Sequence, residues 1–107
     1  MRTALLGAVA LLALTAAARS PGTGAVVHIR DDAFVPASIT VKAGDKVTFI
    51  NDDDDAHTAT ADDMSWDSEG LNQGQKWTHA FAKAGKVAYH CTVHPMMHGT
   101  VVVRSAS

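Results

Sequence analysis

The strongest constraint on the fold is a series of short runs rich in Val, Ile, Phe and Thr, which begins at Ala25 and ends at Arg104. Turn-forming residues separate these runs at close spacing, and no segment keeps a helical period for long enough to predict a helix. Such a series is typical of an all-β sandwich or barrel. The sequence therefore predicts one all-β domain, over residues 25–107.

Alternation of apolar and polar residues places the individual strands, because successive side chains of a strand point to opposite faces. The alternation is clearest in 38–42, 46–51 and 75–82. We expect 31–36 to break the sheet and 62–74 to form a long surface connection. The expected strands are 25–30, 38–42, 46–51, 57–60, 75–82, 87–91 and 100–104.

Residues 1–18 have the pattern of a cleavable signal peptide. Arg2 gives a positive start, Leu5–Leu14 is an apolar run, and Ala16–Ala18 supplies the small residues that a signal peptidase needs. Retention as a membrane anchor is the alternative, but the uncharged run is shorter than the roughly 20 residues that span a bilayer. We expect cleavage at the end of this segment, a flexible linker at 19–24, and an exported, periplasmic protein.

Composition excludes several classes of function. At 107 residues the chain has room for one small domain, which we expect to be a monomer. A formal charge of −2 gives no basic surface for nucleic acid. The single cysteine, Cys91, cannot form an intramolecular disulfide. In an exported protein a lone thiol needs protection from oxidation, and a metal would supply it.

The segment Cys91-Thr-Val-His94-Pro-Met-Met97 holds a thiolate, an imidazole and a thioether within seven residues. Blue-copper centres use two histidines and one cysteine, with a long axial bond to methionine. The loop thus predicts a copper site that lacks one histidine. Met96 competes with Met97 for the axial position, whereas His90 precedes Cys91 on a strand and should point to the opposite face.

His57 is the best candidate for the missing ligand, because it follows a polar loop at the start of an expected strand. Asn51, at the beginning of that loop, is expected to hydrogen-bond to the Cys91 loop through Thr92, since such outer bonds orient metal ligands. The run Asp52–Asp55 could be a calcium loop, but it lacks the ligand spacing and the glycine of an EF-hand. We interpret it as a solvated, charged loop.

The chain resembles the cupredoxins, most closely the amicyanin and plastocyanin branch. The resemblance covers roughly residues 25–104, and the short spacing from cysteine to methionine is similar to the amicyanin form. The matching residues are Phe34-Val-Pro36, Ile39-Thr-Val-Lys-Ala-Gly-Asp45, Asn51, His57-Thr58 and Tyr89-His-Cys-Thr-Val-His-Pro-Met-Met-His-Gly99.

This resemblance implies an eight-stranded Greek-key β-sandwich with one type 1 copper ion. It implies His57, Cys91 and His94 as equatorial ligands and Met97 as the axial ligand. Two positions depart from the amicyanin pattern. Thr58 stands where amicyanins usually have Asn, and Val93 replaces a proline, which leaves an amide that could donate to the thiolate.

The function expected from these features is one-electron transfer between redox proteins, with a weak apolar docking patch around His94. An envelope protein that binds or delivers copper without electron transfer is the alternative, because the same ligands would serve. We do not expect an enzyme, since copper oxidases and nitrite reductases need a second copper site and usually a second domain.

Overall fold

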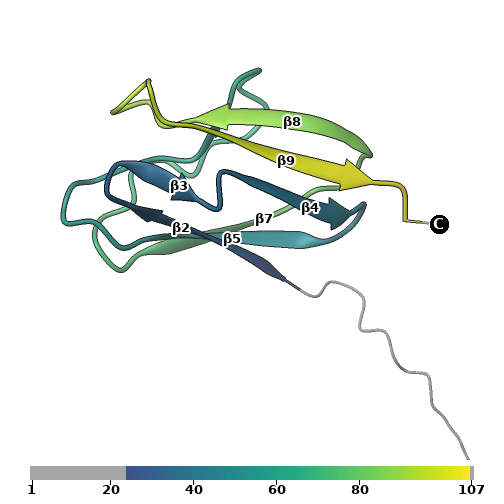
Figure 1. The fold of residues 1–107 in the computed structure, drawn as a ribbon, viewed down its shortest axis with the longest axis horizontal. Helices are drawn as coiled ribbons and strands as arrows, with labels where there is room; N and C mark the ends of the chain where they lie inside the picture. The colour runs from purple at the N-terminus through teal and green to yellow at the C-terminus, as the bar shows by residue number, and fades with distance from the viewer. Residues whose placement is uncertain (1–23, 107) are drawn as a thin grey trace, which may run out of the picture.

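The computed structural model describes residues 24–106, which form two four-stranded sheets packed face to face (Figure 1). The first sheet has the order β3-β2-β5-β7 and the second the order β4-β9-β8-β6. The strands are β2 (Ala25–Arg30), β3 (Ala33–Val35), β4 (Ser38–Lys42), β5 (Lys46–Asn51), β6 (Thr60–Ala61), β7 (Lys76–Ala80), β8 (Gly85–His90) and β9 (His98–Arg104). The expected β-sandwich is confirmed, whereas the predicted signal peptide lies outside the described residues.

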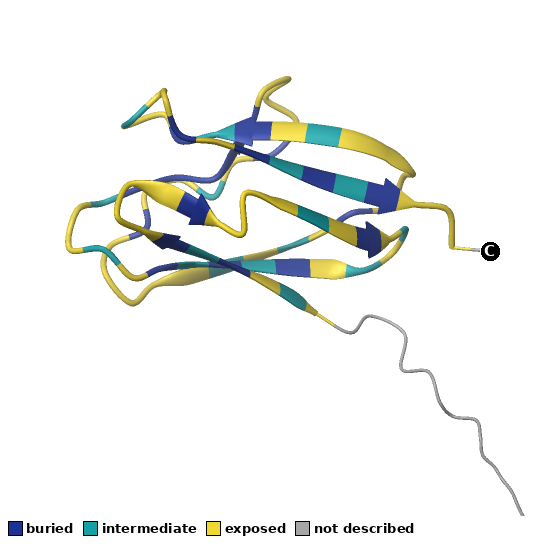
Figure 2. Ribbon diagram, viewed as in Figure 1, coloured by how far each residue is buried: buried dark blue, intermediate teal, exposed yellow. Residues whose placement is uncertain are grey.

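The core forms where the alternating strands turn their apolar faces toward each other (Figure 2). On β5, Val47 and Phe49 are fully buried between less buried neighbours, as the alternation predicted. Phe49 contacts the ring of Tyr89 from the second sheet edge to face, with centroids 5.3 Å apart. Tyr89 in turn requires Gly99 opposite it on β9, because a Cβ at that position would collide with the tyrosine ring.

Three expectations about local structure are wrong. Residues 31–36 do not only break the sheet: Ala33–Val35 pairs antiparallel with β2. The strand expected at 57–60 is displaced, because His57 makes one isolated bridge and regular pairing is confined to Thr60–Ala61. The connection 62–74 is not wholly at the surface, because it buries Trp66 and Leu71 in the core.

Chain topology brings two loops to one end of the sandwich. The β8–β9 loop and the long loop after β5 lie at the left of Figure 1, opposite the C-terminus. The parallel pairing of β5 with β2 also brings the β2–β3 turn to that end. No helix within residues 24–106 is long and apolar enough to cross a membrane.

Candidate metal centre

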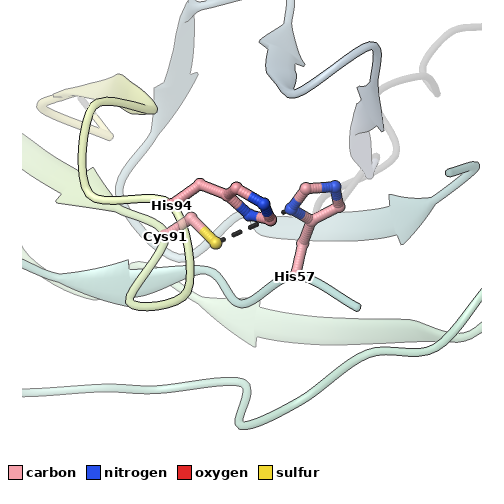
Figure 3. A group of neighbouring side chains, drawn as sticks. All are labelled: His57, Cys91 and His94. Carbon is pink, nitrogen blue, oxygen red and sulfur yellow. Dashed lines mark hydrogen bonds between the residues drawn. The ribbon is translucent and has the colours of Figure 1, made fainter. Parts of the chain in front are cut away.

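Three of the predicted ligands converge at this end of the sandwich. One donor atom each from His57, Cys91 and His94 lies within 4.8 Å of the other two. Figure 3 shows the two imidazole rings and the sulfur directed toward one another, and the ring centroids are 4.8 Å apart. Cys91 and His94 lie 34 and 37 positions after His57 in the sequence, and the fold brings all three together.

Cys91 follows the last residue of β8 and is fully buried. Its Sγ lies 3.7 Å from Nδ1 of His57, a separation at which one metal ion could bind both atoms. The amide of Thr58 donates a hydrogen bond of 3.3 Å to the same sulfur. The Val93 amide, which the sequence suggested as a second donor, makes no bond to this sulfur in the described part of the chain.

The loop from Cys91 to Met97 closes on itself. The Cys91 amide donates to the carbonyl of Met97 at 3.2 Å, and the Met97 amide donates to the carbonyl of His94 at 2.9 Å. Met97 is 3% exposed whereas Met96 is 75% exposed, so that of the two only Met97 can lie in an interior site. This difference supports the choice made from the sequence.

His57 is fully buried, and both of its ring nitrogens have a defined neighbour. Its backbone is fixed by a reciprocal pair of hydrogen bonds with Leu71, at 3.1 and 2.8 Å. With Nδ1 toward Cys91, the Nε2–H donates to Oδ2 of Asp53 at 2.9 Å, and Oδ1 of Asp32 lies 3.5 Å away. The ring is therefore oriented on both sides.

His94 is only half-buried, and its Nδ1 is buried without a hydrogen-bond partner among the described residues. A buried nitrogen without a partner is costly, and such an atom calls for an explanation such as an ion. Together with the thiolate, the Nδ1 of His57 and the buried thioether, it fits a soft metal such as copper.

Asn51 does not brace the Cys91 loop as predicted. Its amide group donates to the carbonyls of Asp55 and Leu71, at 2.8 and 2.7 Å, and its oxygen accepts from the Asp53 amide. Asn51 thus shapes its own loop and the backbone that carries His57. The side chain is buried in that loop and does not extend to Thr92.

Thr58 makes the bond to the loop that was predicted for Asn51. Its hydroxyl accepts from the Thr92 amide at 2.9 Å and lies 3.2 Å from the Thr92 hydroxyl. Thr58 follows His57 directly, so one residue connects a predicted ligand to both the sulfur and the loop beyond it. The one indication of this role in the sequence was that Thr58 stands where amicyanins usually have asparagine.

Asp53 is a functional candidate that the sequence does not reveal, because the run 52–55 has the composition of a solvated loop. Its side chain is 17% exposed, and its oxygens accept from the amides of Asp31 and Asp32 at 2.8 and 3.0 Å. The Asp32 amide is the main cause that lowers the pKa of Asp53 below its usual range. The only indication in the sequence was that this carboxylate lies four positions before His57, a candidate ligand.

Two other polar residues that the sequence did not predict as ligands lie outside the cluster. His90 is half-buried and bonds to Asp62 at 2.7 Å, away from the sulfur, as its position before Cys91 predicted. Asp52 is hydrogen-bonded to His28 at 2.8 Å and forms an ion pair with Arg30 at 3.1 Å, on the outer face of the first sheet.

Comparison with known proteins gives one consistent result. The family model described as a cupredoxin-like domain matches residues 2–103. Amicyanin from Paracoccus denitrificans is 32% identical over 82% of this chain and 71% of its own length. Amicyanin-alpha from Methylorubrum extorquens is 33% identical over 90% of this chain and 85% of its own length.

Solved structures agree with the sequence comparison. Amicyanin from Paracoccus versutus superposes with a TM-score of 0.69 at 29% identity, and the match covers 79% of this chain and 85% of that one. An oxidised single-residue mutant of amicyanin gives a TM-score of 0.72 at 31% identity, over 80% and 86% of the two chains. The cluster of His57, Cys91, His94 and Met97 is typical of the single type 1 copper site that cupredoxins of this kind carry.

Proposed function

The chain belongs to the cupredoxin family, and from that premise we propose that it binds one copper ion through His57, Cys91, His94 and Met97 and carries single electrons between redox proteins. When bound, copper in such a site alternates between Cu(I) and Cu(II). The observation that carries the proposal is the convergence of a buried sulfur and two imidazoles, one of which has a buried nitrogen without a partner.

The surroundings of His94 support electron exchange with a protein partner. Val93 is 54% exposed and Met96 is 75% exposed, and Pro95 between them is exposed as well. These residues form an apolar patch beside the half-buried ring. Transient redox complexes use small interfaces, so a patch of this size is sufficient for brief docking.

Export to the periplasm is part of the proposal. The pattern of residues 1–18 supports it. The one thiol of the chain is fully buried and faces a histidine, which suits an oxidising compartment in which a free exposed cysteine would be modified.

The visible absorption spectrum of the oxidised, copper-loaded protein tests the ligand assignment. We expect an intense thiolate-to-copper band that is lost in Cys91→Ser, because no other thiol is present. Met97→Leu should shift the band and raise the reduction potential, because it removes the weak axial ligand. Met96→Leu is the matched control and should leave the spectrum unchanged, and a colourless copper-bound protein would refute the proposal.

Kinetics separate a carrier from the copper-delivery protein that was the alternative from the sequence. A carrier exchanges electrons rapidly between its own oxidised and reduced forms and holds the metal in both. We therefore expect fast self-exchange by NMR line broadening and no transfer of Cu(I) to a competing chelator on that time scale. Release of Cu(I) with slow self-exchange would favour delivery.

A further inference from the structure

The environment of the His57 ring contains a feature that the ligand set does not explain. A neutral imidazole carries one proton, on either Nδ1 or Nε2. If Nδ1 is to bind a metal beside Cys91, the proton must be on Nε2. The carboxylate of Asp53 lies 2.9 Å from Nε2 and can only accept a hydrogen bond, so it selects that tautomer.

The Asp53 carboxylate is held in place by the backbone. The β2–β3 turn places Asp31 and Asp32 in the left-handed region, with φ of 52° and 56°, and both amides point at the carboxylate. Consecutive amides arranged in this way form an anion-binding concavity. Non-glycine residues seldom adopt this conformation, so the turn bears a local cost that the bonds to Asp53 offset.

Asn51, at the start of the loop, also helps to position Asp53. Oδ1 of Asn51 accepts from the amide of Asp53 at 3.0 Å, which fixes the backbone from which the carboxylate extends. The Asp53 side chain is therefore positioned without any contribution from His57. Its carboxylate accepts two backbone amide bonds, and its own amide donates a third to Asn51. Asp32, with a side chain 58% exposed and 3.5 Å from the ring, is a weaker second neighbour.

We propose that Asp53 is a positioning residue that fixes His57 as the Nε2–H tautomer and makes Nδ1 a stronger electron donor, so that the site favours Cu(II) and has a lower reduction potential. The inference rests on the proposed function, because it takes Nδ1 of His57 to be a copper ligand. Carboxylate partners raise the basicity of metal-bound histidines in this way.

Asp53→Asn tests the inference, and Asp54→Asn is the matched control. Both substitutions remove one negative charge from the same loop, but Asp54 is exposed and makes no hydrogen bond or ion pair with residues 24–106. We expect Asp53→Asn to weaken Cu(II) binding about 10- to 100-fold, to weaken Cu(I) binding less, and hence to raise the reduction potential. Asp54→Asn should stay close to wild type in all three measurements.

The tautomer of His57 gives a second readout that needs neither copper nor a folded variant. Nitrogen-15 NMR of the copper-free wild-type protein should show the proton of His57 on Nε2, in a strong hydrogen bond. A proton on Nδ1 would overturn the inference, and so would equal changes in copper affinity for the two variants. A wild-type protein without the thiolate band would instead refute the proposed function, while an Nε2 proton would still support the positioning of His57 by Asp53.

Discussion

The two histidines that face Cys91 are held by different means. His57 is fully buried, its backbone is paired with Leu71, and its ring is oriented by Asp53. His94 is half-buried, and its ring has no hydrogen bond to the described residues. Although the ring centroids are only 4.8 Å apart, one histidine is held by the sandwich and the other by a seven-residue loop.

Because they are held differently, the two histidines are suited to different roles within the site. A ligand fixed from both sides keeps the geometry constant when the charge of the metal changes. A ligand at the surface gives electrons a short path to a partner. The exposed apolar residues Val93, Pro95 and Met96 belong to the loop that carries His94. The comparison therefore predicts that changes on the two sides have unequal effects.

Removal of each ring in turn should give the largest contrast. His57→Gly leaves an internal cavity and removes the hydrogen bond between the ring and the Asp53 carboxylate, so we expect the copper-free protein to lose about 2–5 kcal/mol of stability. His94→Gly should lose about 0.5 kcal/mol, because its ring is partly in water. Chemical denaturation of the copper-free proteins measures both values.

Added imidazole sharpens the same contrast. In His94→Gly the gap opens to solvent, so free imidazole should restore the visible band of the copper protein. In His57→Gly the gap is enclosed, and imidazole should restore little. Equal stability losses, or equal recovery of the band, would show that the two sides do not differ as the structure indicates.

Thr58 connects the two sides, and its removal should have an intermediate effect. Thr58→Val keeps the shape of the side chain but leaves the Thr92 amide without its acceptor. We expect a loss of about 1–2 kcal/mol in the copper-free protein and faster hydrogen exchange in the loop that carries His94. Thr78→Val, which breaks a hydroxyl pair with Thr48 on the exposed outer face, is the control and should cost less. A loss no greater than that of the control would mean that the loop holds its shape without Thr58.

The pH dependence should be the smallest of these effects. Because backbone amides lower the pKa of Asp53, its stabilising charge is present above the unfolded value of about 3.9 and is lost only as pH falls through the lower, folded value. His57 should therefore stay braced in mild acid. The difference in the free energy of unfolding between copper-free wild type and Asp53→Asn should be constant from about pH 8 to 5 and should shrink only as pH falls below about 3.9.

Chemical denaturation of the two copper-free proteins across that range measures the difference. A difference that already shrinks between about pH 8 and 5 would contradict the prediction, because the charge of Asp53 would then be lost above its unfolded value of about 3.9.

Much of the fold followed from local pattern, and the errors have a physical cause. The strands at 25–30, 38–42 and 46–51 match the structure, because alternating side chains report one buried face. The three-residue strand β3 was missed and the two-residue strand β6 was predicted too early in the chain, because so few residues show no alternation. Burial of Trp66 depends on contacts with distant strands, which no local pattern records.

For the candidate metal centre, too, one part could be predicted from the sequence and another part could not. The spacing of Cys91, His94 and Met97 lies within one loop and could be interpreted from the sequence, and His57 could be chosen by the chemistry of the donor set. Which side chain would support these residues could not be derived. Asn51 was expected to reach Thr92, but in the fold that contact belongs to Thr58.

The sequence by itself determined an all-β chain with a thiolate, two imidazoles and a thioether, because residue chemistry and short-range spacing require no knowledge of the fold. Only the tertiary structure decided which of four consecutive aspartates turns inward. That choice depends on the β2–β3 turn, which places two amides of a different segment opposite Asp53. Hydrogen bonds between segments about 20 residues apart exist only once both segments are fixed in space. They hold the carboxylate that in turn bonds to His57.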